Sequence, residues 1–186
     1  MAFQRRVQGE WNDTVVSWAT WSEIVHSEIV VRDAAGLRSF SAYDKPPPAF
    51  VERVDRSVFA RESLHWVFVK IPIDPAKKQV VYDFIHSLIA ANLRYATGWE
   101  CVLPETLVDR FQDDLHPLTP ASQWKTRGVF CSQVGLLFLK HLQLRNCLRR
   151  DLSPCLPHNS FHCSPGFLYH FLTRDLGLPK VTPTAA

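Results

Sequence analysis

Two stretches near the start of the chain alternate between apolar and polar positions, as strands with one buried face do. Residues 24 to 31 (IVHSEIVV) are rich in β-branched side chains, and the alternation places His26 and Glu28 on the same face. The turn signal DAAG at residues 33 to 36 separates them from residues 37 to 43 (LRSFSAY). We therefore expect the two stretches to pair as an antiparallel hairpin.

The length of the turn sets the register of this hairpin. With a four-residue loop, Arg32 pairs with Leu37, and Glu28 then lies opposite Ser41. Ser41 would be diagonal to His26, about 7–8 Å away between backbones, a gap that side chains partly close. The hairpin therefore predicts two polar neighbours for His26.

Further along, the pattern changes to strand and then helix. Three prolines at 46 to 48 end the hairpin and predict a surface loop, and residues 65 to 71 (HWVFVKI) predict a further strand. A helix follows, with Asp74 as its N-cap, Pro75 at its first position and Gly98 beyond its end. The apolar stripe expected of this helix consists of Val81, Phe84, Ile85, Leu88 and Ile89.

A second helix is predicted where Cys131 leads into SQVGLLFLKHLQLR, whose apolar residues run almost all round the helical wheel. Cys131 would lie at or near the N-terminus of this buried helix. A last short helix is expected over residues 167 to 176. Strands come first and helices later, so we predict an α+β fold with an antiparallel sheet packed against helices, in one domain over residues 1 to 186.

Composition and charge argue against nucleic-acid binding and against a membrane-spanning segment. The formal charge of +3 is spread along the 186 residues without a basic block, so nucleic-acid binding gains no support. No apolar run approaches the roughly 20 residues of a membrane helix, and the first residues lack the apolar core of a signal peptide. We expect a cytoplasmic protein without a transmembrane segment. The five cysteines are an odd number at irregular spacings, which favours reduced thiols.

Cys131 and His26 are the strongest candidates for chemistry. The orphan N–H groups and the positive dipole end of a helix N-terminus favour a thiolate at Cys131. A nearby histidine can accept the thiol proton and later donate it to the leaving group. Trp18 and Trp21 precede the histidine strand and could wall a substrate groove. The alternative reading of Cys131 alone is a small buried core residue.

The segments VHSEIVV and VFCSQVGLLF together resemble the circularly permuted NlpC/P60 papain-like hydrolases, a group that includes YiiX-like proteins and lecithin retinol acyltransferase. In that family a strand bearing the histidine precedes a helix that begins with the cysteine, and His26 precedes Cys131 here. The segment GLRSFSAY, a helix from 75 to 97 and the late residues 163 to 165 also resemble family elements. The resemblance covers most of residues 18 to 172.

This resemblance implies a papain-like cysteine peptidase, amidase or acyl hydrolase, with Cys131 as nucleophile and His26 as general base. It implies no metal or organic cofactor, and a peptide-like or acyl-lipid substrate. Some family members are encoded by phages and viruses, for which host cytoplasm would be the location. The family orients its histidine with a polar residue, often Glu, on the neighbouring strand. Ser41 stands at that position in this chain, and we expect it nearer the imidazole than Glu28, the other candidate for this orienting role.

A different class of function stays open beside the hydrolase. Cys155, His158, His162 and Cys163 have spacings that could bind zinc, although the paired framework of common zinc sites is absent. Such a chain would be a noncatalytic, zinc-stapled interaction module. An inactive member of the papain-like fold, kept as a binding protein, fits the same residues.

Overall fold

The structure is a computed structural model. It describes residues 1–6, 21–33, 36–43, 49–53, 65–93, 95, 117–118, 129–152 and 163–182. The chain divides into two compact units. Unit 1 contains Met1–Ser41, Glu52–Ile71 and Ser164–Ala186, and unit 2 contains Ala42–Val51 and Pro72–Cys163. The single-domain prediction is not tested by this division. The expected helices and antiparallel strands are present, so the α+β prediction is confirmed.

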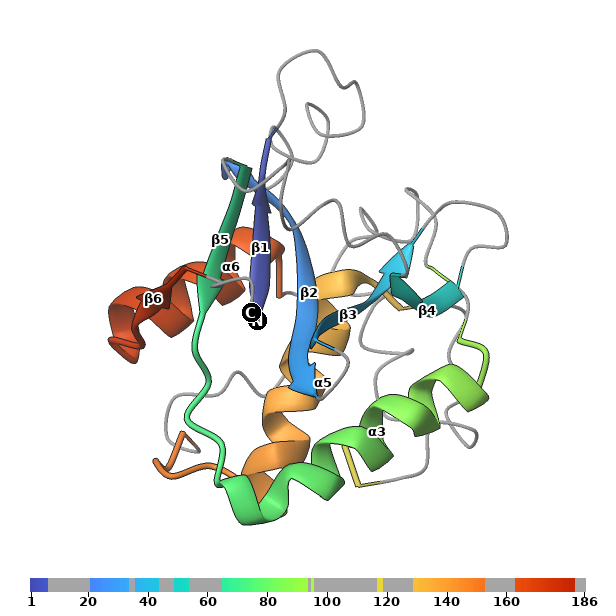
Figure 1. Ribbon diagram of the computed structural model, residues 1–186. Helices are drawn as coiled ribbons and strands as arrows, with labels where there is room; N and C mark the ends of the chain where they lie inside the picture. Colours follow the sequence, from blue (N-terminus) through green and yellow to red (C-terminus); the bar gives the residue numbers. More distant parts are fainter. Residues whose placement is uncertain are drawn as a thin grey trace, which may run out of the picture. The chain divides into compact units, whose positions relative to one another are not determined.

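Six strands form one sheet in the order β4-β3-β2-β1-β5-β6 (Figure 1). Their bounds are β1 Ala2–Arg5, β2 Ile24–Asp33, β3 Gly36–Tyr43, β4 Ala49–Arg53, β5 Trp66–Val69 and β6 Lys180–Val181. β1 pairs antiparallel with β2 on one side and with β5 on the other. The histidine strand β2 therefore lies inside the sheet.

The hairpin of β2 and β3 has the predicted register. Arg32 pairs with Leu37, and the ladder continues to Asp33 opposite Gly36, so the connection is shorter than the four residues expected. Gly36 adopts φ 111°, a conformation that disfavours residues with a Cβ. Arg38 of β3 makes a bidentate ion pair with Glu52 of β4: its Nε lies 2.6 Å from Oε1 and its Nη2 lies 2.5 Å from Oε2. Glu52 thus belongs to a strand that begins where only a loop was expected.

Unit 1 also holds a C-terminal helical segment, α6 at Pro165–His170 followed by one π-helical turn, η5 at Phe171–Asp175. This confirms the short helix expected over residues 167 to 176. Ser164 caps α6 by accepting a hydrogen bond from Phe167 N at 3.1 Å. α6 packs against β2, and a Cβ on Gly166 would collide with the Ser22 side chain. The glycine is what permits this close approach.

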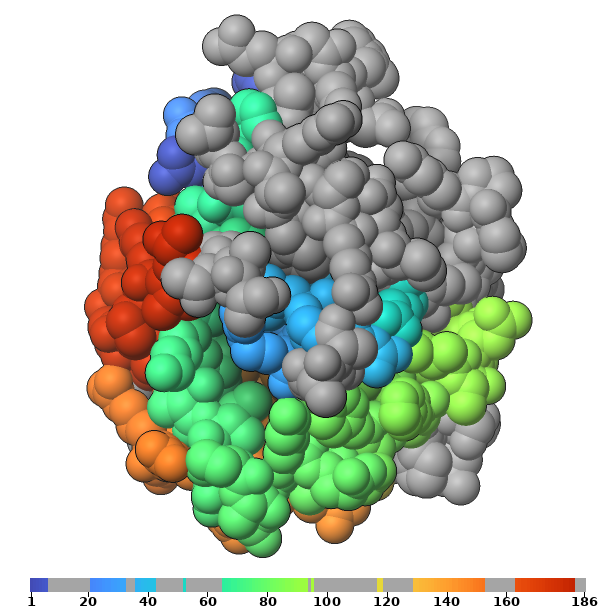
Figure 2. Space-filling view, in the orientation of Figure 1, coloured from blue at the N-terminus to red at the C-terminus, as the bar shows by residue number. Residues whose placement is uncertain are grey.

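In unit 2, Asp74 accepts a hydrogen bond from Ala76 N at 3.0 Å and begins the turn η2, Pro75–Lys77. Helix α3 follows at Lys78–Ala90 and ends before Gly98. Its end coincides with Asn92 at φ 49°, a left-handed conformation that asparagine tolerates better than most residues. Figure 2 shows α3 (light green) at the surface, with its exposed face outward. The predicted helix is therefore correct in its start and wrong in its end.

Helix α5, Cys131–Leu144, confirms the buried helix predicted from its apolar wheel. Every residue from Cys131 to Leu139 is buried, and Phe138 packs near Phe84 of α3 with ring centroids 5.9 Å apart. Within the described ranges, no helix combines the length and apolar character needed to cross a membrane.

Candidate functional site

His26 lies in the middle of the sheet of unit 1. On β1 its backbone partner is Gln4, which also pairs with Trp66 of β5, so the three residues form a row across three strands. The imidazole and the Trp66 indole meet edge to face, with ring centroids 6.3 Å apart and planes at 81°. The His26 side chain keeps 15% of its surface exposed. It is held on one side by the tryptophan while part of it reaches solvent.

Glu28 supplies a carboxylate to this histidine. Its Oε1 lies 3.5 Å from His26 Nε2, and its side chain is only 1% exposed. Side chains two apart on a strand point in parallel and seldom meet closely, and the length of the glutamate closes the gap. The contact places a carboxylate beside Nε2 and leaves the other ring nitrogen, Nδ1, on the side of the ring away from Glu28.

Ser41 makes a different contact. Its hydroxyl donates a hydrogen bond to the main-chain carbonyl of Ser27 at 2.8 Å, and the residue is 2% exposed. The bond joins β3 to β2 at the position where the register brings Ser41 beside Glu28. Ser41 was expected nearer the imidazole than Glu28, yet its hydroxyl is used by the backbone of β2. Of the two candidates for the third role, the contacts of Glu28 fit it better.

Cys131 is the first residue of α5, and it is 6% exposed. The N-cap is Phe130, whose side chain has no polar atom, so it makes no cap hydrogen bond to the first turn. Amides of a first helical turn have no partner within the helix and carry the positive end of its dipole. An anion at the start of α5, such as a thiolate or an oxyanion, would be stabilised there.

Two other thiols of unit 2, Cys147 and Cys163, are buried like Cys131. Burial raises the pKa of Cys163 to about 12, and the charge of Cys131 adds to that rise while Lys140 opposes it. Burial also raises the pKa of Cys147. Both thiols keep their protons at neutral pH, which makes them poor nucleophiles. None of the three is in a disulfide.

The two halves of the predicted catalytic pair lie in different units, with His26 in unit 1 and Cys131 in unit 2. That the two side chains meet therefore stays a prediction from the sequence.

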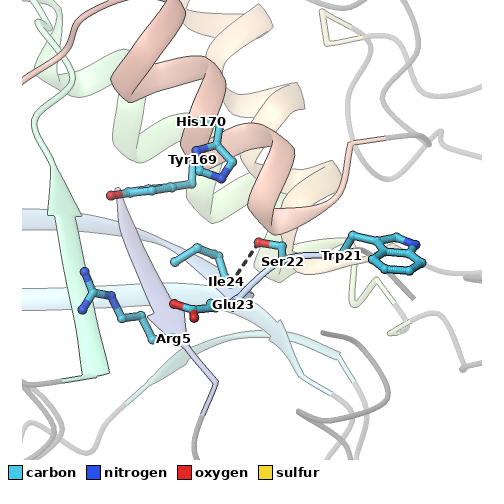
Figure 3. A pocket seen from close by; sticks show the side chains of 7 residues that line it. All are labelled: Arg5, Trp21, Ser22, Glu23, Ile24, Tyr169 and His170. Atoms are coloured by element: carbon cyan, nitrogen blue, oxygen red, sulfur yellow. Dashed lines mark hydrogen bonds between the residues drawn. The ribbon is translucent and has the colours of Figure 1, made fainter. Parts of the chain in front are cut away.

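A cavity of about 310 Å³ opens on unit 1 at the start of β2 (Figure 3). Trp21 is among the residues that line it, and Trp18 lies outside the described residues. That Trp21 walls a substrate groove stays a prediction. Trp21 has φ 50° and is 90% exposed. The other side chains around it come from β1, the start of β2 and α6, and include Arg5, Glu23, Tyr169 and His170. Only the tryptophan of this set was indicated by the sequence.

The zinc alternative depends largely on residues outside the described ranges, namely Cys155, His158 and His162. Among the residues that are described, no three His, Cys, Asp or Glu side chains are grouped as a metal site requires.

His141, on the buried face of α5, makes stability depend on pH. Its Nδ1 lies 2.7 Å from the carbonyl of Pro117, and its ring is 4.5 Å from that of Phe84. Burial lowers the pKa of His141 from 6.5, the Pro117 hydrogen bond opposes this, and Arg145 adds to it. The unfolded chain therefore binds this proton first, and below pH 6.5 the histidine removes stability as the pH falls.

We expect the free energy of unfolding to decrease between about pH 7 and 5.5, and the His141→Phe variant, which keeps the aromatic ring, to decrease less. Urea unfolding of both proteins across this range measures the difference. The exposed His86 of α3 offers the control, because His86→Asn should leave the slope unchanged. Equal slopes for wild type and His141→Phe would contradict the prediction.

Comparisons of the chain with protein families, curated proteins and solved structures find no match.

Proposed function

We propose that the chain is a thiol hydrolase or acyltransferase with the permuted papain-like arrangement, which cleaves an amide or ester through an acyl-thioester on Cys131. The observation that carries the proposal is the position of Cys131 as the first residue of a long buried helix. The helix dipole and the amides of the first turn favour the thiolate, the form that attacks a carbonyl carbon.

The histidine half of the site adds support from unit 1. A general base must be held in one orientation, and its charged form must be stabilised when it has taken the proton. The buried carboxylate of Glu28 lies 3.5 Å from His26 Nε2, where it can stabilise that charge. His26, Cys131 and Glu28 then take the roles of base, nucleophile and orienting carboxylate, and Ser41 ties β3 to β2.

The reaction proceeds in two steps. His26 takes the thiol proton, the Cys131 sulfur bonds to the substrate carbonyl carbon, and the carbonyl π electrons move to its oxygen. When this oxyanion collapses, the bond to the alcohol or amine breaks, and the leaving group receives the proton from His26. Water, activated by the same histidine, then hydrolyses the thioester and restores the thiol. For an acyltransferase, a second acceptor replaces the water.

The experiment that tests this function is capture of the acyl-thioester with p-nitrophenyl acetate, an activated ester small enough to reach a confined site. Acetyl should appear on Cys131 and not on Cys147 or Cys163, because burial raises the pKa of both other thiols. Failure of the folded protein to form any adduct at Cys131 would end the proposal.

A further inference from the structure

Gln133 is a buried polar residue in the first turn of α5, two positions after Cys131, and it is 1% exposed. Its side-chain Oε1 accepts a hydrogen bond from the main-chain N–H of Phe130 at 3.3 Å. Because that partner is a donor, the amide orientation is fixed: the oxygen faces Phe130, and the NH₂ group is the other end.

The NH₂ end of Gln133 has no hydrogen-bond partner, although its nitrogen is buried. Leaving a buried donor without an acceptor destabilises the folded chain, so such groups are rare. The nitrogen and oxygen of the Gln133 amide are bonded to the same carbon, so the nitrogen lies near the peptide that links Val129 to Phe130, at the start of α5. The side chain of Phe130 offers no acceptor to this turn.

The NH₂ group of Gln133 is therefore a buried donor without an acceptor at the start of α5. The first turn also carries the positive end of the helix dipole, which favours a negatively charged ligand. The substrate of the proposed reaction supplies an acceptor, the oxygen of the carbonyl whose carbon Cys131 attacks.

We propose that Gln133 is a further catalytic residue, whose Nε2 donates a hydrogen bond to the oxyanion formed on a substrate amide or ester carbonyl during acyl transfer to Cys131. The inference rests on the proposed function. No proton moves from Gln133; the donor stabilises the negative oxygen as it forms and is released when the oxyanion collapses. A donor fixed in advance in a dry site lowers the barrier more than one that must reorganise.

The test compares two reactions of the same thiol. Acetylation by p-nitrophenyl acetate passes through a tetrahedral oxyanion, whereas alkylation by iodoacetamide displaces iodide at a saturated carbon and forms no oxyanion. Gln133→Glu retains an acceptor for Phe130 N and removes the donor. Gln133→Met removes both without adding a charge. Rates at Cys131 are followed by peptide mass mapping.

We expect Gln133→Met to slow acetylation of Cys131 by about 10²–10³-fold while alkylation changes by no more than about threefold. Gln133→Glu should slow the acetylation of Cys131 at least as much as Gln133→Met does. The control is Gln143 at the far end of the helix, whose amide is satisfied by Asp151 at 2.8 Å and by Leu152 N at 2.9 Å. Gln143→Met should leave the ratio of the two rates unchanged.

Equal changes in both reactions would mean that Gln133 only supports the fold, and they would overturn the inference. A wild type that is alkylated rapidly at Cys131 yet never acetylated would also overturn it, with the nucleophile intact. If wild-type Cys131 reacts with neither reagent, the proposed function fails, and the role of Gln133 fails with it.

Discussion

Replacing Cys131 by serine is expected to lower the turnover of p-nitrophenyl acetate by about 10³-fold or more, because removing a nucleophile leaves only the binding and oxyanion contributions to catalysis. The serine hydroxyl occupies the position of the thiol but does not ionise near neutral pH, so it is a poor nucleophile. Since the two side chains are similar in size, the variant should retain the fold. Steady-state hydrolysis, corrected for the rate without protein, measures the effect.

The matched control is Cys147→Ser, which changes another buried thiol of unit 2. Burial raises the pKa of the Cys147 thiol, so it should contribute nothing to turnover. Cys131→Ser with wild-type turnover, or the same loss in both variants, would show that Cys131 is not the nucleophile.

His26→Ala is expected to slow turnover by about 10²–10⁴-fold, the usual contribution of a positioned acid or base. Without the imidazole, no group accepts the proton of the thiol or donates a proton to the leaving group.

Glu28→Gln keeps the shape of the side chain and removes the charge beside Nε2, so it should reduce kcat by about tenfold or more with little change in KM. The pH dependence of kcat should shift in Glu28→Gln, which a purely structural residue would not cause.

Ser41→Ala separates the two candidates for the orienting role. Its hydroxyl bonds to the Ser27 carbonyl, so its loss should cost about 1 kcal/mol of stability and leave kcat near wild type. If Ser41→Ala loses activity and Glu28→Gln does not, the roles are reversed. If His26→Ala turns over as fast as wild type, His26 is not the base.

The hairpin of β2 and β3 and the helices α3 and α5 could be predicted because their signals are local. Alternation indicated the faces of the two strands, and the turn signal indicated the register, so Arg32 was matched with Leu37 correctly. Capping chemistry placed the start of the segment before α3, at Asp74. The end of α3 was missed, because the left-handed Asn92 is a weak stop signal beside the later Gly98.

β1 was missed for a different reason. It has only four residues, and a strand that short, AFQR, carries no period that can be separated from chance. Its place between β2 and β5 is decided by pairing with strands distant in the chain, which local patterns do not encode. The cavity partners Tyr169 and His170 depend on the same long-range packing.

For the candidate site, sequence reasoning named His26, Glu28, Ser41 and Cys131, and it favoured Ser41 over Glu28 as the nearer neighbour of the histidine. The contact between His26 and Glu28 depends on side-chain rotamers, and the hydroxyl of Ser41 is drawn to a nearby carbonyl. Gln133 had one available signal, a glutamine in the first turn after a candidate nucleophile. That signal became informative only when the amide proved to be buried with one end unsatisfied.

The measurement that tests the account most directly is the mass of the chain and of its peptides after brief reaction with p-nitrophenyl acetate and an acid quench. The account predicts one acetyl group on Cys131, labile to hydroxylamine as a thioester is, absent from Cys131→Ser and formed far more slowly in His26→Ala. Acetyl found only on other residues, or a Cys131 that reacts only after denaturation, would contradict it and leave Cys131 as a buried core thiol.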